Sequence, residues 1–514
     1  MSTADWWVVG VYLAAMLALA AALGRSNKSR QDYYLAGSDL PPAALATSIL
    51  ATQCSTNSLL GAPAFVGFSI AGGLVWLQYE LAVPLAMLAL TLLFPAIHRS
   101  GVISIYAFLG QRLGREVRLT ASACFLFFRG VATGVTVYGV ASVLALVTGL
   151  NYLSAVLLFM GVTIAYDVMG GMRAVVISDV VQMLLLVTAV AVSLVALGPL
   201  LGDFSAELAL RRETLFLDWG FSGNGNFGLW PMLFGGLFLY VAYYGCDQSQ
   251  AQRLLAAKDQ RALNRILLLN GVLRFPLVLA YCFLGLGLAA YGLEHSDFVA
   301  SLPRTEGGSP NVNLAFPAYV LREFAPGLAG LAIVGLFAAA MSSVDSALNS
   351  LSAATVEDFL PPGDKEHPVR LSRVVTLGWG SFAVGFSFFV EHIASTILEA
   401  INKIGSVANG PLLALFIIAV LRPGTPGKVV LGGFGIGLAV NLGLWRGAPQ
   451  VSWLWWNPAG CIAALAATLL LATALPAGSA VVAPPEAVKS PDRRSVQVML
   501  LMAFLAMATM LVLM

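Results

Sequence analysis

The stretch Leu336-Phe337-Ala338-Ala339-Ala340-Met341-Ser342-Ser343-Val344-Asp345-Ser346 places a carboxyl group inside a strongly hydrophobic run. Ser342, Asp345 and Ser346 share one helix face, because positions i, i+3 and i+4 are neighbours on an α-helix. A carboxylate is costly in lipid, so an intramembrane Asp normally faces a partner, a water-filled path or a bound ion. The serines alone would also suit close helix packing. With Asp345 included, this face predicts a site for a hard cation.

The composition around this stretch is that of a membrane protein. Of 514 residues, 59% are hydrophobic and only 11% charged, whereas soluble domains carry roughly 25% charged residues. We therefore predict an all-α polytopic membrane protein with about 14 transmembrane helices. The apolar stretches lie near 5–24, 41–69, 74–97, 119–148, 152–169, 175–200, 230–250, 265–292, 316–355, 371–391, 396–421, 428–446, 452–475 and 495–514.

The basic residues predict the orientation of these spans. With the N-terminus outside, 20 of the 28 Lys and Arg residues fall in inner loops, as the positive-inside rule requires. Both termini are then predicted outside, and the Ala- and Leu-rich composition suggests a bacterial inner membrane. The net charge of +2 therefore reflects topology and gives no indication of nucleic-acid binding. The five cysteines lie in predicted spans without paired spacing, so neither a disulfide framework nor a zinc site is expected.

Two spans are interrupted by polar residues. The segment 41–69 is longer than one span requires and contains Gln53-Cys54-Ser55-Thr56-Asn57-Ser58. Polar backbone at membrane depth is tolerated only where it lines a cavity or is buried in protein. Five spans later, 230–250 turns polar at Asp247-Gln248-Ser249-Gln250, and two such helices opening two halves indicate an inverted-repeat transporter. The alternative for Asp247 and Gln248 is an ordinary helix end at the cytoplasmic surface.

Five motifs follow one another along nearly the whole chain. They are Asp32-Tyr33-Tyr34-Leu35-Ala36-Gly37, Gly170-Gly171-Met172-Arg173 through Gln182, Gln248-Ser249-Gln250-Ala251-Gln252-Arg253, Met341-Ser342-Ser343 through Ser346, and Asn402-Lys403-Ile404-Gly405-Ser406 with Gly410-Pro411. Together they resemble the sodium:solute symporter family, which includes sodium-coupled transporters of sugars, sialic acid, proline, vitamins, monocarboxylates and iodide.

The resemblance implies a LeuT-type fold with two inverted repeats of five helices and additional flanking helices. Residues 1–40 would then hold the first helix and a cytoplasmic loop, 41–200 the first repeat, 230–421 the second repeat and 422–514 additional C-terminal helices. It also implies a common sodium site. Carried over to this chain, its ligands are the backbone carbonyls of Ala51, Cys54 and Ala339 and the side chains of Ser342 and Ser343. An unwound helix suits such a site because its freed carbonyls can coordinate sodium.

Some family members hold a second sodium ion, and the matching residues here are Asp179, Ser342, Asp345 and Ser346. Asp345 departs from the family, which usually has Ser or Thr at this position. An added carboxylate would tighten a cation site, or titrate and bring protons into the coupling. The alternative is that Asp345 pairs with a basic residue in a structural bridge. We expect one sodium ion as the coupling ion, and a second if Asp345 is a ligand.

The solute is expected near the midplane, beside the broken helices. The candidates are Ser55, Asn57, Ser58, Gln78, Glu80, Arg129, Tyr243 and Arg274. The resemblance puts Arg274 where sugar transporters carry a pocket Lys, and Tyr243 at the place of an inner-gate tyrosine. Arg129 and Arg274 could clamp a carboxylate in bidentate fashion, which favours an organic anion. Alternatively, Glu80 or Asp345 neutralises these arginines and removes the anion preference.

These observations predict a sodium-coupled secondary active symporter that imports a small organic solute, favouring a carboxylate-bearing or other anionic one, by alternating access. A transporter of a neutral sugar and a solute sensor on the same fold remain the alternatives. A channel would need repeated polar rings along a pore. An enzyme is not expected, because neither a metal cluster nor a nucleophile elbow is present. The expected partners are the solute and the lipid bilayer, with no nucleic acid.

Overall fold

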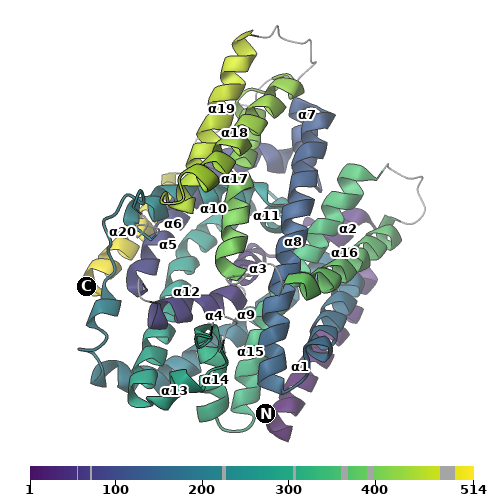
Figure 1. Cartoon of the computed structure of the whole chain (residues 1–514). Coiled ribbons are helices and arrows are strands. Elements are labelled where there is room, and N and C mark those ends of the chain that lie inside the picture. Colours follow the sequence, from purple (N-terminus) through teal and green to yellow (C-terminus); the bar gives the residue numbers. More distant parts are fainter. Residues whose placement is uncertain are drawn as a thin grey trace.

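The computed structural model describes residues 1–54, 56–69, 72–222, 227–304, 308–360, 368–390, 397–474 and 493–513. Within these ranges all regular secondary structure is helical (Figure 1). Long apolar segments become helices because a helix satisfies every backbone N–H and C=O internally, which lipid cannot do. The prediction of an all-α polytopic architecture is thereby confirmed.

The helices follow the chain in two groups. The first comprises α1 (Thr3–Leu23), α2 (Arg30–Leu35), α3 (Pro42–Gln53), α4 (Thr56–Phe68), α5 (Leu77–Glu80), α6 (Ala82–Arg99), α7 (Ile105–Leu113), α8 (Arg115–Thr148) and α9 (Tyr152–Asp203). The second comprises the π-helix η5 (Pro231–Gly235), α10 (Gly236–Cys246), α11 (Gln248–Leu255), α12 (Gln260–Glu294), α13 (Asp297–Ser301), α14 (Ala315–Glu323), α15 (Leu328–Ala354), α16 (Pro368–Val390), α17 (Ile397–Leu421), α18 (Gly427–Gly447), α19 (Trp456–Ala474) and α20 (Arg493–Leu513).

The predicted count of about 14 spanning helices is not confirmed. Among the described residues, ten helices are long and apolar enough to cross a membrane, and three shorter apolar helices accompany them. Two predicted spans, 152–169 and 175–200, lie on either side of a kink at Gly171 and are counted together as the 52-residue α9. The predicted spans 230–250 and 396–421 correspond to the shorter apolar helices Pro231–Cys246 and Gly405–Leu421. The predicted span 41–69 is divided between α3 and α4, each too short to cross a membrane alone.

The helix that carries the Ser and Asp face lies at the centre of the bundle. In the segment Leu328–Phe359, which contains α15, 83% of the most hydrophobic 18-residue stretch is buried inside the protein. The corresponding share for the peripheral segment Arg494–Leu513 is 17%. α15 packs against α9, α1, α3 and α8 (Figure 1). The polar residues of α15 therefore face protein rather than lipid.

The Gly-Gly motif bends α9. Gly171 has φ = 60°, and a Cβ atom there would come within 2.8 Å of the Tyr33 ring. The Asn27 amide donates to the Gly170 carbonyl at 2.8 Å, which satisfies a carbonyl at the bend. Glycine is needed here because other residues rarely adopt this left-handed backbone conformation. The bend separates α9 into two arms, and Asp179 lies in the second arm.

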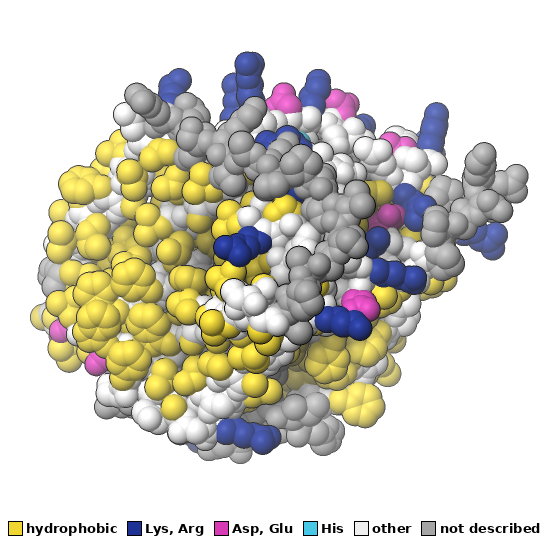
Figure 2. Space-filling view, turned by 90° about the horizontal axis from the view of Figure 1, so that it is seen from above, with side chains coloured by type: hydrophobic (Ala, Val, Ile, Leu, Met, Phe, Trp, Pro, Cys, Tyr) yellow, Lys and Arg dark blue, Asp and Glu magenta, His cyan; other side chains and the backbone are white. Residues whose placement is uncertain are grey.

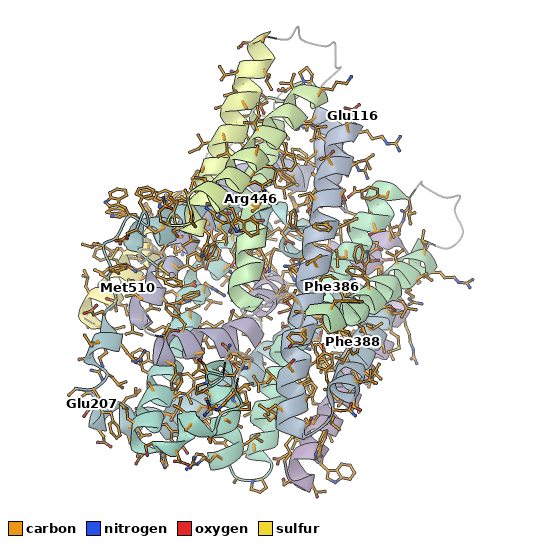
Figure 3. All side chains as sticks on the ribbon, viewed as in Figure 1. Glu116, Glu207, Phe386, Phe388, Arg446 and Met510 are labelled. Carbon is orange, nitrogen blue, oxygen red and sulfur yellow. The ribbon has the colours of Figure 1, made fainter. Side chains whose placement is uncertain are left out.

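Two exposed carboxylates mark the opposite ends of the molecule. Glu116, near a predicted inner loop, and Glu207, in a predicted outer loop, lie far apart at opposite ends (Figure 3). The N-terminus lies at the same end as Glu207 (Figures 1 and 3). This arrangement agrees with the predicted alternation of loops, but which end faces the cytoplasm stays a prediction.

Candidate functional site

The first polar interruption is a break between α3 and α4. Cys54 caps α3 with φ = −80° and ψ = 55°, so the helix stops there although its N–H still reaches the Leu50 carbonyl at 2.7 Å. The Ser58 hydroxyl donates to the Gln53 carbonyl at 3.2 Å and bridges the break. Ser55 and the side chain of Asn57 lie outside the described residues, so their predicted solute contacts stay predictions. The break itself was predicted from the polar run.

Two hydroxyls of α15 lie against this break. The Ser342 hydroxyl donates to the carbonyls of Ala51 at 3.1 Å and Ala339 at 3.2 Å. The Ser343 hydroxyl lies 3.2 Å from the Ala339 carbonyl and 3.1 Å from that of Thr52. Four of the five predicted sodium ligands thus come together, with Cys54 at the adjoining helix end. Thr52 was missed, because the family resemblance carried over only the carbonyls of Ala51, Cys54 and Ala339.

This arrangement offers several oxygens to a hard cation at the end of α3, where the helix is interrupted. Ser342 is buried, whereas Ser343 is partly exposed and faces the break. Sodium would compete with the hydroxyl hydrogens for the same carbonyls. A bound ion would then replace these hydroxyl-to-carbonyl hydrogen bonds with ion–oxygen contacts that join α3 to α15.

A second polar cluster lies around the buried guanidinium of Arg253, which is 1% exposed. This guanidinium contacts the Asp179 carboxylate at 3.3 Å and donates to the hydroxyls of Ser48, at 2.6 Å, and Ser346. Ser48 also donates to Asp179. Asp179 and Ser346, both predicted at a second sodium site, are therefore brought together by a cation of the protein itself. The sequence motif that contains Arg253 was recognised, but its partner was not.

Asp345 has no basic partner within the described residues. One carboxylate oxygen accepts hydrogen bonds from the Ser346 N–H and, at 3.1 Å, from the Ser346 hydroxyl. The other oxygen is buried and accepts none from the described part of the chain. One oxygen of Asp179 is in the same situation. The bridge considered for Asp345 is thus formed by Asp179 and Arg253, and Asp345 retains a free oxygen.

The second polar interruption is a buried break and not a helix end at the surface. α10 ends at Cys246, Asp247 is extended with φ = −92° and ψ = 120°, and α11 begins at Gln248. The Asp247 carboxylate accepts the N–H of Ser249 at 2.8 Å as an N-cap. Gln248, Ser249 and Gln250 are fully buried. Of the two alternatives left by the sequence, the structure therefore favours the interrupted helix.

Arg274 forms a buried ion pair with Glu80. Its Nε lies 2.9 Å from one Glu80 oxygen, and its Nη2 lies 3.3 Å from the other. Tyr240 donates to the same carboxylate at 3.2 Å. The remaining nitrogen, Nη1, meets the Cys54 sulfur at 3.0 Å, at the end of α3. Arg274 is thus neutralised, but one of its nitrogens points at the helix break.

Arg129 is also paired with a carboxylate. Its guanidinium lies 3.7 Å from Asp247, donates to the Ser249 hydroxyl and sits 5.9 Å from the centre of the Tyr243 ring. The Tyr243 hydroxyl accepts from the Gln250 amide at 2.9 Å. Of the two alternatives left by the sequence, the structure favours the one in which acidic residues neutralise both arginines. Glu80 is one of the predicted neutralising residues, and Asp247 replaces Asp345 as the other.

Gln78 is held by backbone groups. Its amide nitrogen donates to the carbonyls of Val75 and Phe227, each at 3.1 Å, and its oxygen accepts the Phe216 N–H at 2.9 Å. Both polar atoms of the Gln78 side chain are therefore engaged, and the bonds to Phe216 and Phe227 hold the segment between α9 and α10 against the bundle. A solute contact by Gln78 would have to break these bonds.

Comparisons with known proteins identify the family of this chain. The family model described as "Sodium:solute symporter family" matches residues 33–425. The chain belongs to the sodium:solute symporter family. Its members and relatives are transporters and not enzymes, as predicted.

Several named relatives of this symporter cover most of its length. A putative sodium-dependent multivitamin transporter of Drosophila melanogaster is 28% identical, over 87% of this chain and 75% of that protein. The human sodium/iodide cotransporter is 27% identical, over 86% and 70%. The Xenopus laevis sodium-coupled monocarboxylate transporter 1 is 27% identical, over 87% and 71%.

A solved structure establishes the fold. The outward-open, substrate-bound Na+-coupled sialic acid symporter superposes with a TM-score of 0.82, at 22% identity, over 93% of this chain and 99% of that one. At this identity the likeness concerns the fold alone. The division into two inverted repeats and the bacterial membrane remain predictions, since the relatives named above come from animals.

Proposed function

We propose that this symporter couples sodium entry to the import of a small organic solute. The observation that carries the proposal is the meeting of Ser342 and Ser343 with the carbonyls of Ala51, Thr52 and Ala339 at the break of α3. Oxygens from two helices that can separate make a site whose sodium affinity differs between two conformations. Only such a difference allows an ion gradient to drive a conformational cycle.

A second sodium ion is proposed at Asp345. Its free, buried oxygen and the Ser346 and Ser342 oxygens beside it provide a carboxylate ligand without a competing basic partner. Asp179 lies across Arg253 from Ser346 and would join the site when the guanidinium moves. The charge argument supports this, because a buried carboxylate without a counter-charge is costly.

For the solute, we propose a small organic anion. Nη1 of Arg274 faces the break and has only a thiol, a weak acceptor, as its partner. A carboxylate oxygen would be a stronger acceptor for this nitrogen than the Cys54 sulfur. The relatives, which transport iodide and monocarboxylates, support an anion. Glu80 already neutralises Arg274, so a bound anion would need a sodium ion nearby for charge balance. This requirement would couple the binding of the solute to the binding of sodium.

A neutral solute such as a sugar is the second candidate, and the two ion pairs favour it. Glu80 with Arg274, and Asp247 with Arg129, leave the region without a net positive charge. The two candidates differ in one measurable respect. Thermal unfolding of the purified protein should shift with monocarboxylates in sodium but not in potassium if the solute is an anion, and with sugars if it is neutral.

The decisive test of sodium coupling is Ser343→Ala in reconstituted vesicles. Removing one oxygen should raise the sodium concentration for half-maximal uptake by about tenfold, as expected for the loss of ~1.4 kcal/mol of binding. Ser350→Ala is the matched control, because Ser350 is buried in the same helix and donates only to its own Ala347 carbonyl. Full uptake by Ser343→Ala with unchanged sodium dependence would remove the assignment.

A further inference from the structure

A cavity of about 370 Å³ opens at the surface between the segment that precedes α3 and the start of α12. It is lined by residues 38–42 on one side and by residues 258–265 on the other. Both segments adjoin loops rich in basic residues, which the charge pattern predicts to be cytoplasmic. The cavity lies between the starts of α3 and α12, the helices that carry the proposed site residues Ala51 and Arg274.

Three cationic side chains line the cavity. Lys258, Arg261 and Arg265 are all exposed, and none forms an ion pair with another residue in the described part of the chain. Arg261 and Arg265 are four residues apart and therefore lie on the same face of α12. Arginine forks match the oxygens of a phosphate group.

Two acidic residues also line the cavity. Asp259 caps α12 by accepting the Ala262 N–H at 2.8 Å, and this hydrogen bond, together with the nearby charges of Arg261 and Lys258, holds the pKa of Asp259 below its ordinary value. Asp39 lies 3.9 Å from Arg173, which is not part of the lining. By formal charge, three basic and two acidic side chains give the lining a net charge of +1, which favours an anion. The N-terminus of α3 adds partial positive charge, because no side chain caps it.

Two leucines follow Arg265 on the same face of α12. From Arg265, steps of four residues reach Leu269, which is partly buried, and Leu273, which is 44% exposed. An exposed apolar side chain on a membrane-spanning helix, such as Leu273, faces lipid chains. A ligand with a phosphate at Arg261 and Arg265 could therefore lay a hydrocarbon chain along Leu269 and Leu273, which a soluble phosphate could not do.

We propose that this cavity binds the phosphate headgroup of an anionic phospholipid, with an acyl chain along α12. Basic side chains near a membrane surface attract anionic lipids, and here they surround a cavity rather than a flat surface. Figure 2 views the molecule from above and shows Lys and Arg side chains along its upper edge and right side. Basic residues away from the cavity serve as controls for unspecific attraction.

The test uses the purified full chain in detergent, with phosphatidylglycerol, phosphatidylcholine or inorganic phosphate added. Native mass spectrometry measures retained lipid, and thermal unfolding measures stabilisation. Arg261→Gln with Arg265→Gln should weaken phosphatidylglycerol binding by about tenfold or more. Arg422→Gln with Lys428→Gln is the matched control, because both residues are exposed, lie in another basic loop and remove the same charge. The control should retain binding.

Three outcomes would overturn the proposal. Equal weakening by both double variants would show unspecific surface attraction, and equal retention of both lipids would show no headgroup preference. Stabilisation by inorganic phosphate with the same dependence on Arg261 and Arg265 would identify a soluble anion instead. Unfolding of each variant without lipid checks that it folds, and Arg265→Gln alone replaces the double variant if that one does not.

Discussion

Asp345 and Arg253 are charged residue types in buried environments. Asp345 is buried in a membrane helix, and one of its carboxylate oxygens has no hydrogen-bond partner among the described residues. Arg253 is also buried, but it forms an ion pair with Asp179. The position of Asp345 on the helix face was predictable from the spacing of Ser342 and Ser346. Its lack of a basic partner was not, because partners come from other helices.

Replacing Asp345 tests the second ion. Asp345→Asn removes the carboxylate charge but keeps the shape, so the second sodium ion should bind more weakly and the Hill coefficient for sodium in uptake should fall toward one. Asp297→Asn is the control, since Asp297 is exposed and pairs only with Arg322. An unchanged Hill coefficient would show that Asp345 is not an ion ligand.

Replacing Arg253 tests the buried ion pair. Arg253→Gln leaves the Asp179 carboxylate buried without its cation and should lower the free energy of unfolding by about 3–5 kcal/mol. The double variant Arg253→Gln with Asp179→Asn should recover part of this loss, because the uncompensated charge is gone. Thermal unfolding of four proteins in potassium, namely the wild type, Arg253→Gln, Asp179→Asn and the double variant, gives the cycle. Purely additive losses would mean that the two residues do not interact.

At the level of single elements, the interrupted and bent helices determine where the polar groups lie. The break at Cys54 frees carbonyls for the hydroxyls of α15, and the break at Asp247 turns α11 so that Arg253 reaches Ser48 and Ser346. The bend at Gly171 directs the second arm of α9, and with it Asp179, toward the same cluster. These polar runs were recognisable in the sequence because uninterrupted lipid-facing helices do not contain them.

The bend of α9 can be tested with glycine variants. Gly171→Ala places a Cβ on a residue with φ = 60° and within 2.8 Å of the Tyr33 ring, so it should destabilise the protein by about 1–3 kcal/mol. Gly161→Ala, in the same helix, meets nothing within 4 Å and should be neutral or stabilising. Comparing the midpoints of thermal unfolding decides the matter. Equal midpoints for the two variants would contradict a required bend.

At the scale of the whole molecule, the distribution of charge predicts the orientation in the membrane. Glu207 and the N-terminus share one end of the bundle, and Glu116 marks the other (Figures 1 and 3). The basic loops predict that the end with Glu116 faces the cytoplasm. The native cysteines give little background for labelling, because four are buried and Cys124 is only partly exposed.

This orientation predicts a labelling pattern in intact cells. A membrane-impermeant maleimide should label Glu207→Cys from outside, whereas Glu116→Cys should react only after permeabilisation. Both positions are exposed, so accessibility within the protein does not limit either reaction. The protein without introduced cysteines provides the background. The reverse pattern would show that the termini face the cytoplasm.

The sequence alone determined the all-helical membrane class, the family and the face of α15 that meets the broken helix. These properties depend on composition, on periodicity and on short motifs, all of which are local. Only the tertiary structure decided which charges compensate each other. Glu80 neutralises Arg274, and Asp247 neutralises Arg129. Arg253 forms an ion pair with Asp179 and not with Asp345. Each pair joins different helices, and the Coulomb energy depends on distances in space that residue spacing along one helix does not specify.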